Sequence, residues 1–205
     1  MNRRTSCQYF TRQRPAPALS SPGDGATIGR WMVSFAGYPL GGYAAYLLTG
    51  RVDSAGAALG GGFLTGAILG AVRAWAMGQA RPRAVAWILA TAVGLMAGVA
   101  VGAALVDDRT DLGSLVLQGA VGGGLVGVAQ WVVLAPRLGA LALVWPPFLS
   151  GTFALGWAVT TSVGLDVDQQ FTIFGSSGAL PATLLTAVLP LVLDRRPAGS
   201  ARARH

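Results

Sequence analysis

Ser177 is the residue whose neighbours come closest to those of a catalytic nucleophile, in the string Gly175-Ser176-Ser177-Gly178. A serine attacks a substrate only where a nearby base takes its proton. The only histidine is His205, glutamate and lysine are absent, and the aspartates lie in short connections or tails between the apolar segments. Because no base falls within an apolar segment, we expect no enzymatic activity.

The same string is similar to the GxSG motif of rhomboid intramembrane proteases, with Ser177 in the place of the nucleophile. Rhomboids use a histidine from a later helix as the base, and no counterpart exists here. Pro181 cannot donate to the carbonyl of Ser177, so we expect a broken helix at this point. Broken helices near the membrane midplane are where transporters often bind a solute.

Three further polar residues lie within or beside apolar segments and complete a candidate solute site. Arg73 lies about one turn from a segment end, so we expect it either to reach toward the interface or to line an inner vestibule with Gln130. Gln118 could donate a hydrogen bond between helices. The candidate solute site therefore consists of Ser176, Ser177, Pro181, Gln118, Gln130 and Arg73.

Metal and cofactor chemistry have few candidate ligands in this sequence. Cys7 is the only cysteine and His205 the only histidine, so no disulfide, thiolate metal site, iron–sulfur cluster or histidine-ligated haem can form within the chain. Asp107, Asp108 and Asp111 could bind a divalent cation, but the ligand spacing of an EF-hand is absent and solvated helix-end charges are the expected role. We expect no metal and no cofactor.

The composition indicates a polytopic membrane protein of the all-α class. Of 205 residues, 53% are apolar and 11% are charged, whereas about a quarter are charged in soluble domains. Apolar runs of about 20 residues, each long enough to cross a bilayer as a helix, predict six transmembrane helices. These predicted spans are residues 31–50, 55–77, 84–106, 113–134, 142–164 and 171–193. Pro146 and Pro147 suit a first helical turn, so the fifth span could begin later.

The domain organisation follows from these spans. We expect a polar basic cytoplasmic tail over 1–29, a transmembrane domain over 30–194 and a short basic cytoplasmic tail over 195–205. The arginines lie in tails and short loops and not on one face with interleaved aromatic residues, so the net charge of +7 does not indicate nucleic-acid binding. The partner that we expect is the lipid bilayer, with a homo-oligomer or a larger membrane complex as further partners.

Charge in the connections predicts the orientation. The two tails and the loops 78–83 and 135–139 hold 13 of the 15 arginines, when Arg30 and Arg73 are included, and the other three loops hold six of the eight aspartates. Cytoplasmic loops retain arginine and lysine, so we expect both termini on the cytoplasmic side of a bacterial inner membrane. Five tryptophans near the arginine-rich ends predict an interfacial aromatic belt: Trp31, Trp75, Trp87, Trp131 and Trp145.

Glycines spaced four apart mark one face of several spans. A side-chain-free face lets helix backbones approach closely in lipid, either within one chain or at a seam with a partner. The glycine zippers are Gly62, Gly66 and Gly70; Gly94, Gly98 and Gly102; Gly119, Gly123 and Gly127; and the shorter pair Gly37 and Gly41.

A shift of the sequence by 57 residues superimposes many of these glycines. It places Gly37 on Gly94, Gly41 on Gly98, Gly62 on Gly119, Gly66 on Gly123 and Gly70 on Gly127. The repeating unit is a helical hairpin, so we expect three hairpins of which the first two are an internal repeat and the third is a divergent copy or an unrelated hairpin.

The segment from Gly127 to Trp131 has the form G-x-x-Q-W within a glycine-rich hairpin. In this it resembles a loose group of uncharacterised bacterial membrane proteins with repeated hairpins, and the resemblance implies no activity. The sequence favours a structural or accessory membrane protein that packs through its glycines. The alternative is a small-solute channel or facilitative transporter with its site near Ser177 and Pro181.

Overall fold

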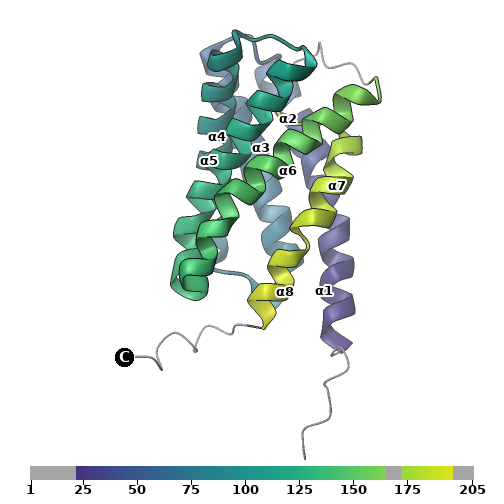
Figure 1. The fold of residues 1–205 in the computed structure, drawn as a ribbon, viewed down its shortest axis with the longest axis vertical. Helices are drawn as coiled ribbons and strands as arrows, with labels where there is room; N and C mark the ends of the chain where they lie inside the picture. Colours follow the sequence, from purple (N-terminus) through teal and green to yellow (C-terminus); the bar gives the residue numbers. More distant parts are fainter. Residues whose placement is uncertain (1–21, 165–171, 196–205) are drawn as a thin grey trace, which may run out of the picture.

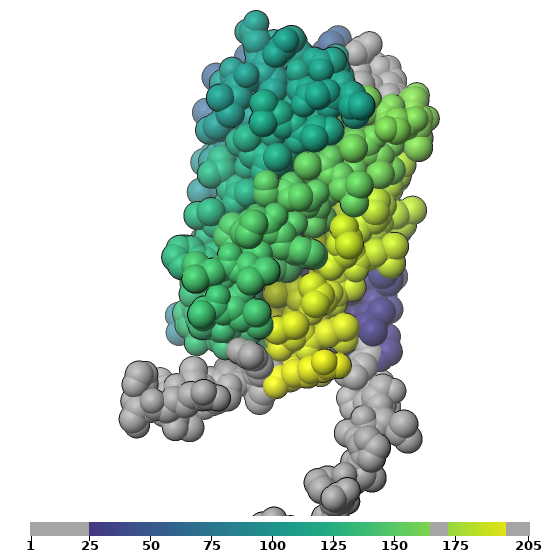
Figure 2. Space-filling view, in the orientation of Figure 1, coloured from purple at the N-terminus to yellow at the C-terminus, as the bar shows by residue number. Residues whose placement is uncertain are grey.

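The computed structural model describes residues 22–164 and 172–195, which form α-helices and short 3-10 turns without any strand. Long helices lie side by side in an elongated bundle (Figure 1). The α-helices are α1 (Pro22–Val33), α2 (Gly37–Thr49), α3 (Ala55–Met77), α4 (Ala84–Val106), α5 (Leu112–Leu138), α6 (Trp145–Ser162), α7 (Ser176–Thr186) and α8 (Val188–Asp194). The 3-10 turns are η1 (Ser34–Ala36), η2 (Gly78–Ala80) and η3 (Gly139–Val144). Figure 2 shows the same face with side chains filled in, where the C-terminal segment (yellow) lies between α6 (green) and the N-terminal helix (purple).

Four segments are long and apolar enough to cross a membrane: Ala55–Ala80, Ala84–Val106, Leu112–Ser162 and Ser176–Asp194. The third has 51 residues because it joins α5, η3 and α6, and these two helices pack side by side (Figure 1). The all-α class is therefore confirmed, and the apolar segments are compatible with a multi-pass membrane protein.

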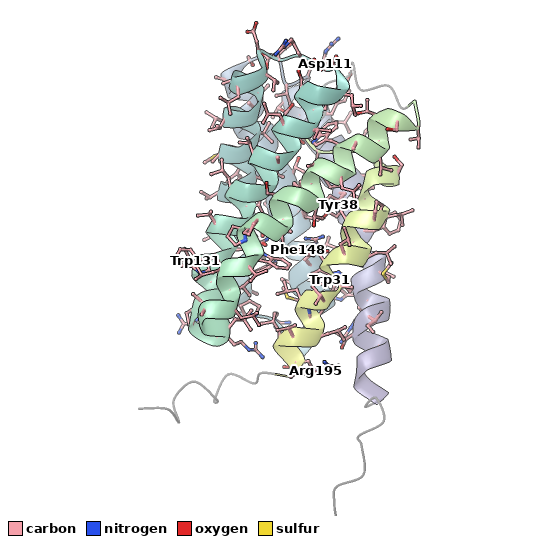
Figure 3. The ribbon with its side chains drawn as sticks, in the orientation of Figure 1. Trp31, Tyr38, Asp111, Trp131, Phe148 and Arg195 are labelled. Carbon is pink, nitrogen blue, oxygen red and sulfur yellow. The ribbon has the colours of Figure 1, made fainter. Side chains whose placement is uncertain are left out.

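The helical path continues in one direction from α1 into α2 and from α7 into α8. Otherwise successive helices run in opposite directions, so the charged connections collect at two ends of the bundle (Figure 1). Asp53, Asp107 and Asp111 belong to connections at one end, here named the aspartate end. Arg81 and Arg195 lie at the other, here named the arginine end, and Figure 3 labels Asp111 and Arg195 at these opposite ends.

Side-chain caps begin two helices at the aspartate end. Ser54 accepts a hydrogen bond from the backbone N–H of Ala57 at 3.3 Å, and Asp111 accepts one from the N–H of Ser114 at 3.1 Å. The Ser114 hydroxyl also donates to Asp111, and these two bonds, the hydroxyl's first, hold the pKa of the Asp111 carboxyl below its usual value.

The first predicted span differs from the structure at both its start and its middle. Helix α1 begins at Pro22, within the 1–29 region expected to be a polar tail, and the helical path is interrupted by η1 before α2. Pro39 explains the interruption, because it has no N–H to donate to the carbonyl of Phe35 four residues earlier. Proline also suits a first turn, which accounts for the start at Pro22.

The last predicted span was wrong in two respects. The helix begins at Ser176 and not at Phe171, because residues 172–175 are non-helical, and residue 171 lies outside the described residues. Pro181 lies inside α7, and the interruption comes at Ala187 instead. Pro190 is its physical cause, since it cannot donate to the carbonyl of Thr186. For the fifth span, α6 starts at Trp145 with Pro146 and Pro147 in its first turn.

The prediction of an interfacial tryptophan belt was wrong for three of its members. Trp31, Trp87 and Trp145 are buried inside the bundle, whereas Trp75 is 54% exposed. The Trp31 indole N–H donates to the carbonyl of Thr183 at 3.1 Å, and the Trp145 N–H donates to Gln130 at 2.8 Å. These rings fill space between helices that glycine and alanine leave open.

Candidate functional site

The glycines of α3 lie directly against the backbone of α4. A Cβ atom added at Gly66 would lie 2.6 Å from the Cα atom of Ala92, closer than real Cβ contacts allow. Gly62 and Gly70 stand one turn away on either side, where the corresponding distances are 2.8 Å to the Cα of Met96 and 3.0 Å to the Cα of Ile88. The two helices therefore touch through backbone atoms over two turns.

The glycines of α4 and α5 repeat this arrangement, each against the next helix. Added Cβ atoms at Gly94 and Gly98 would lie 2.7 Å and 2.6 Å from the Cα atoms of Val126 and Gly122 in α5. Those at the α5 glycines would overlap α6. The α4 and α5 contacts are completed by Gly102 against Gln118, Gly119 against Phe153 and Trp157, Gly123 against Leu149, and Gly127 against Pro146.

Helix α2 contacts α3 through the shorter pair. Gly41 faces the backbone carbonyl of Thr65, at 3.0 Å from an added Cβ, and Gly37 faces Leu69. Each glycine face of α2, α3, α4 and α5 thus points at the helix that follows it in the chain, so these glycines contact helices of the same chain.

The contact register repeats with the 57-residue shift found in the sequence. Gly41 faces Thr65, and 57 positions later Gly98 faces the backbone of Gly122. Similarly, Gly66 faces Ala92 and Gly123 faces Leu149. In the third hairpin, Gly178 of α7 faces the carbonyl of Gly156 of α6, within one residue of the register that a second shift gives.

Arg73 lies in the interior of the bundle. It is 1% exposed, so neither the expected reach toward the interface nor a vestibule-lining role fits its position. Its guanidinium donates to the hydroxyl of Tyr38 in α2 and, at 3.1 Å, to the hydroxyl of Thr186 in α7. The side chain therefore joins three helices from within.

Two aromatic rings cover the Arg73 charge. The guanidinium carbon lies 5.1 Å from the centroid of the Trp31 ring and 5.0 Å from that of Tyr38, within the range of cation–π attraction. Among the described residues no carboxylate pairs with Arg73, and its Nε has no hydrogen-bond partner. The desolvated cation is thus held by ring faces and hydroxyls, and we name Trp31, Tyr38, Arg73, Thr183 and Thr186 the arginine cluster.

This incomplete pairing leads to a prediction about Arg73→Met. A buried charge with imperfect partners can often be replaced by an apolar side chain of similar volume without loss of stability. We expect Arg73→Met to unfold at the same temperature as the wild type or higher, as measured by thermal unfolding in detergent. Arg73→Lys serves as the comparison, because lysine keeps the charge but loses the planar fork, and it should unfold at a lower temperature.

If Arg73→Met instead unfolds well below the wild type, the hydrogen bonds of the arginine cluster stabilise the fold by more than the burial of the charge costs. The bonds to Tyr38 and Thr186 would then be the main attachment of α7 to α3.

Gln130 occupies the position 57 residues after Arg73 and is also fully buried. Its amide donates to the hydroxyl of Thr91 in α4 at 2.9 Å and accepts from the indole N–H of Trp145 at 2.8 Å. Because both ends of its amide are hydrogen-bonded to neighbouring helices, Gln130 connects α4, α5 and α6. The two repeat-equivalent positions therefore hold buried polar side chains in separate clusters and do not share a vestibule.

Ser176 and Ser177 lie at the start of α7. Ser176 lines a cavity of about 200 Å³ between α2 and residues 173–176, together with Tyr38, Gly42 and Phe174. The Ser177 hydroxyl lies 3.5 Å from the hydroxyl of Thr160, at the limit of a hydrogen bond. Pro181, one turn further along α7, is part of a continuous helix and not of a break.

Gln118 is near the aspartate end. It borders two voids of about 10 Å³ each, the volume of one water, one of which reaches Asp108 and Arg109 and the other Thr172. Neither void includes Ser176, Ser177, Arg73 or Gln130, so the structure does not bring the predicted solute-site residues together in one cavity.

Sequence reasoning missed the non-helical segment 172–175, which enters the bundle between α2, α3 and α6. The hydroxyl of Thr172 lies 2.6 Å from that of Thr65 in the middle of α3, and Phe174 contacts Tyr38, Phe153 and Trp157. Thr172, Ile173 and Phe174 are buried, so protein surrounds this irregular segment. The sequence signals are glycines on the helices that the segment contacts: an added Cβ at Gly61 would lie 2.7 Å from the Cγ2 atom of Thr172, and one at Gly156 would lie 2.7 Å from the ring of Phe174.

The structure does not arrange Asp107, Asp108 and Asp111 as a metal site. No group of three His, Cys, Asp or Glu side chains within the described ranges is arranged to hold a metal ion, and Asp111 is instead the cap of α5.

In comparisons with known proteins, no family model, no curated protein and no solved structure matches this chain.

Proposed function

We propose that this chain is an integral membrane protein of structural or accessory type, with six membrane crossings arranged as three hairpins. The crossings are α1 with α2, then α3, α4, α5, α6, and finally α7 with α8. The separation of arginines and aspartates at opposite ends supports this topology, with the arginine end in the cytoplasm of a bacterial cell.

The internal repeat is part of the proposal, and the register of the contacts between successive helices supports it. A 57-residue shift maps the α2–α3 contact onto the α4–α5 contact and the α3–α4 contact onto the α5–α6 contact. The α6–α7 contact at Gly156 and Gly178 has nearly the same register, which favours a divergent third copy over an unrelated hairpin.

The observation that carries the structural role is the use of the glycine faces. All four face the next helix of the same chain at backbone contact, so they serve to close the bundle on itself. The outward surface is then left to leucine, valine and aromatic side chains suited to lipid or to a membrane partner. Among the described residues, most buried polar side chains have a hydrogen-bond partner within the chain, as Gln130 does, and the exceptions are the Arg73 Nε, the Trp87 indole N–H and the Thr183 hydroxyl.

Solute flux in proteoliposomes tests the proposal against its alternative. We expect vesicles containing the purified protein to release glycerol, urea and potassium at the rate of protein-free vesicles. Flux above that rate, abolished by Ser176→Leu in the 200 Å³ cavity, would support the channel or facilitative transporter. Gly151→Leu, at a site with open space around it, is the matched control.

A probe for activated serines tests the absence of a hydrolase. The Ser177 hydroxyl lies 3.5 Å from the hydroxyl of Thr160, and a threonine hydroxyl is not a base. We expect no stable labelling by a fluorophosphonate in native membranes. Stoichiometric labelling that Ser177→Ala removes would replace the structural proposal with an enzymatic one.

A further inference from the structure

A second cavity, of about 430 Å³, opens at the arginine end between α1, the end of α3, η2 and the end of α8. Its charged and polar lining includes Arg30, Arg81, Gln79 and Asp194, and its aromatic lining is Trp75. This volume is within the range of cavities that hold small ligands. The cavity shares no lining residue with the arginine cluster or with the cavity at Ser176, and the proposed function does not depend on it.

The charge of this cavity favours an anion. Two guanidinium groups, of Arg30 and Arg81, and one carboxylate line the cavity. Within the described residues, neither arginine forms a salt bridge. Arg81 donates only a long 3.4 Å bond to the carbonyl of Gly78. Arginine presents several donors in a plane that matches phosphate oxygens, so two arginines with free donors are suited to a phosphate group.

Gly78 makes room for one of these arginines. It has a φ of +54°, and an added Cβ would lie 2.9 Å from the Nη2 atom of Arg30. The guanidinium of Arg30 therefore lies against the turn that ends α3. Glycine suits position 78 because it adopts a positive φ without strain and leaves space for the arginine.

The surroundings of the cavity indicate which phosphate it holds. The cavity borders the last turn of α3, at the end of the apolar segment Ala55–Ala80. In the proposed membrane orientation, this is the level at which the helix leaves the hydrocarbon layer. Trp75, 54% exposed, and Val33, 59% exposed, lie on the two helices that flank it. A tryptophan at a helix end typically lies at the level of the lipid headgroups.

We propose that this cavity binds the phosphodiester headgroup of an anionic phospholipid. Arg30 and Arg81 contact the phosphate, Gln79 and Asp194 are placed to bond headgroup hydroxyls, and Trp75 lies along the upper acyl chain. The inference rests on the proposed membrane location of the chain. It is consistent with the general tendency of basic pockets between membrane helices to bind anionic headgroups on the cytoplasmic side.

Lipid retention by the full-length protein, measured by native mass spectrometry after delipidation and addition of defined lipids, tests the proposal. We expect phosphatidylglycerol to bind more tightly than phosphatidylcholine, and the double variant Arg30→Gln/Arg81→Gln to lose about fivefold in affinity for each arginine. Arg83→Gln is the matched control, since Arg83 is exposed in the same loop but does not line the cavity. It should retain the wild-type preference.

Three results would overturn the inference. Equal loss of phosphatidylglycerol in Arg83→Gln would mean that general charge attraction, and not a cavity, retains the lipid. Equal binding of phosphatidylglycerol and phosphatidylcholine to the wild type would mean that the cavity does not recognise the anionic headgroup. Displacement of the lipid by millimolar inorganic phosphate would identify a soluble anion as the ligand. Carbonate extraction of the double variant is a separate test of membrane insertion, so failure of the proposed function can be distinguished.

Discussion

Gly123→Ala is expected to lower the free energy of unfolding by about 1 to 3 kcal/mol, the usual cost of extra atoms in a packed core. The added methyl group would overlap the backbone carbonyl of Leu149 in α6, and backbone cannot rotate away as a side chain can. Gly66→Ala should behave similarly at the α3–α4 contact. Equilibrium unfolding in mixed detergent micelles measures the change.

Gly151→Ala is the matched control for this prediction. Gly151 lies inside α6 with open space around it, so alanine there gains helix propensity and should stabilise the protein by up to about 1 kcal/mol. Opposite signs at Gly123 and Gly151 would support backbone contact between helices. If both substitutions were neutral, the contact at Gly123 would not exist in the folded protein. If Gly123→Ala left the monomer stable but separated a homo-oligomer, that glycine would face a second chain.

Trp31→Ala is expected to lower the free energy of unfolding by about 3 to 5 kcal/mol, as for other truncations of large buried aromatic side chains. The substitution removes a fully buried ring, its hydrogen bond to Thr183 and the cation–π contact with Arg73. The result is a cavity beside a charge that no carboxylate pairs with in residues 22–164 and 172–195. We expect α1 to detach first, which proteolysis within residues 22–33 would detect.

Trp75→Ala provides the comparison, because the same side chain is removed from a half-exposed position. We expect a change within about 1 kcal/mol, as for other surface substitutions. A similar loss for both variants would mean that Trp31 is no more important to packing than a residue at the lipid boundary, and that the arginine cluster does not hold α1 in place.

The elements predicted from hydrophobic runs were found where runs were long and free of interruptions. Helices α3 and α4 have the predicted bounds, because each is a mostly apolar run of 23 residues bounded by polar residues and free of proline. Errors occurred near prolines, because a proline indicates that a helix could be interrupted but does not show whether it is. Pro39 and Pro190 interrupt the helical path, whereas Pro181 lies within a helix.

The direction in which a polar or aromatic side chain points could not be predicted from the sequence. Trp31 and Trp75 both lie near the arginine end, yet one fills the interior and the other faces outward. The difference depends on which helix face meets a neighbour, and that is decided by contacts between distant segments. Arg73 illustrates the same limit, since its partners Tyr38 and Thr186 come from α2 and α7.

Accessibility of introduced cysteines from the two sides of the membrane tests the proposed topology most directly. Single cysteines replace exposed residues in a Cys7→Ser background: Asp53, Asp108 and Val163 at the aspartate end, and Arg83 and Leu141 at the arginine end. We expect an impermeant thiol reagent to label the first three in intact cells and the other two only after permeabilisation. Labelling of Arg83→Cys or Leu141→Cys in intact cells, with protection of Asp53→Cys, Asp108→Cys or Val163→Cys, would contradict the proposed topology.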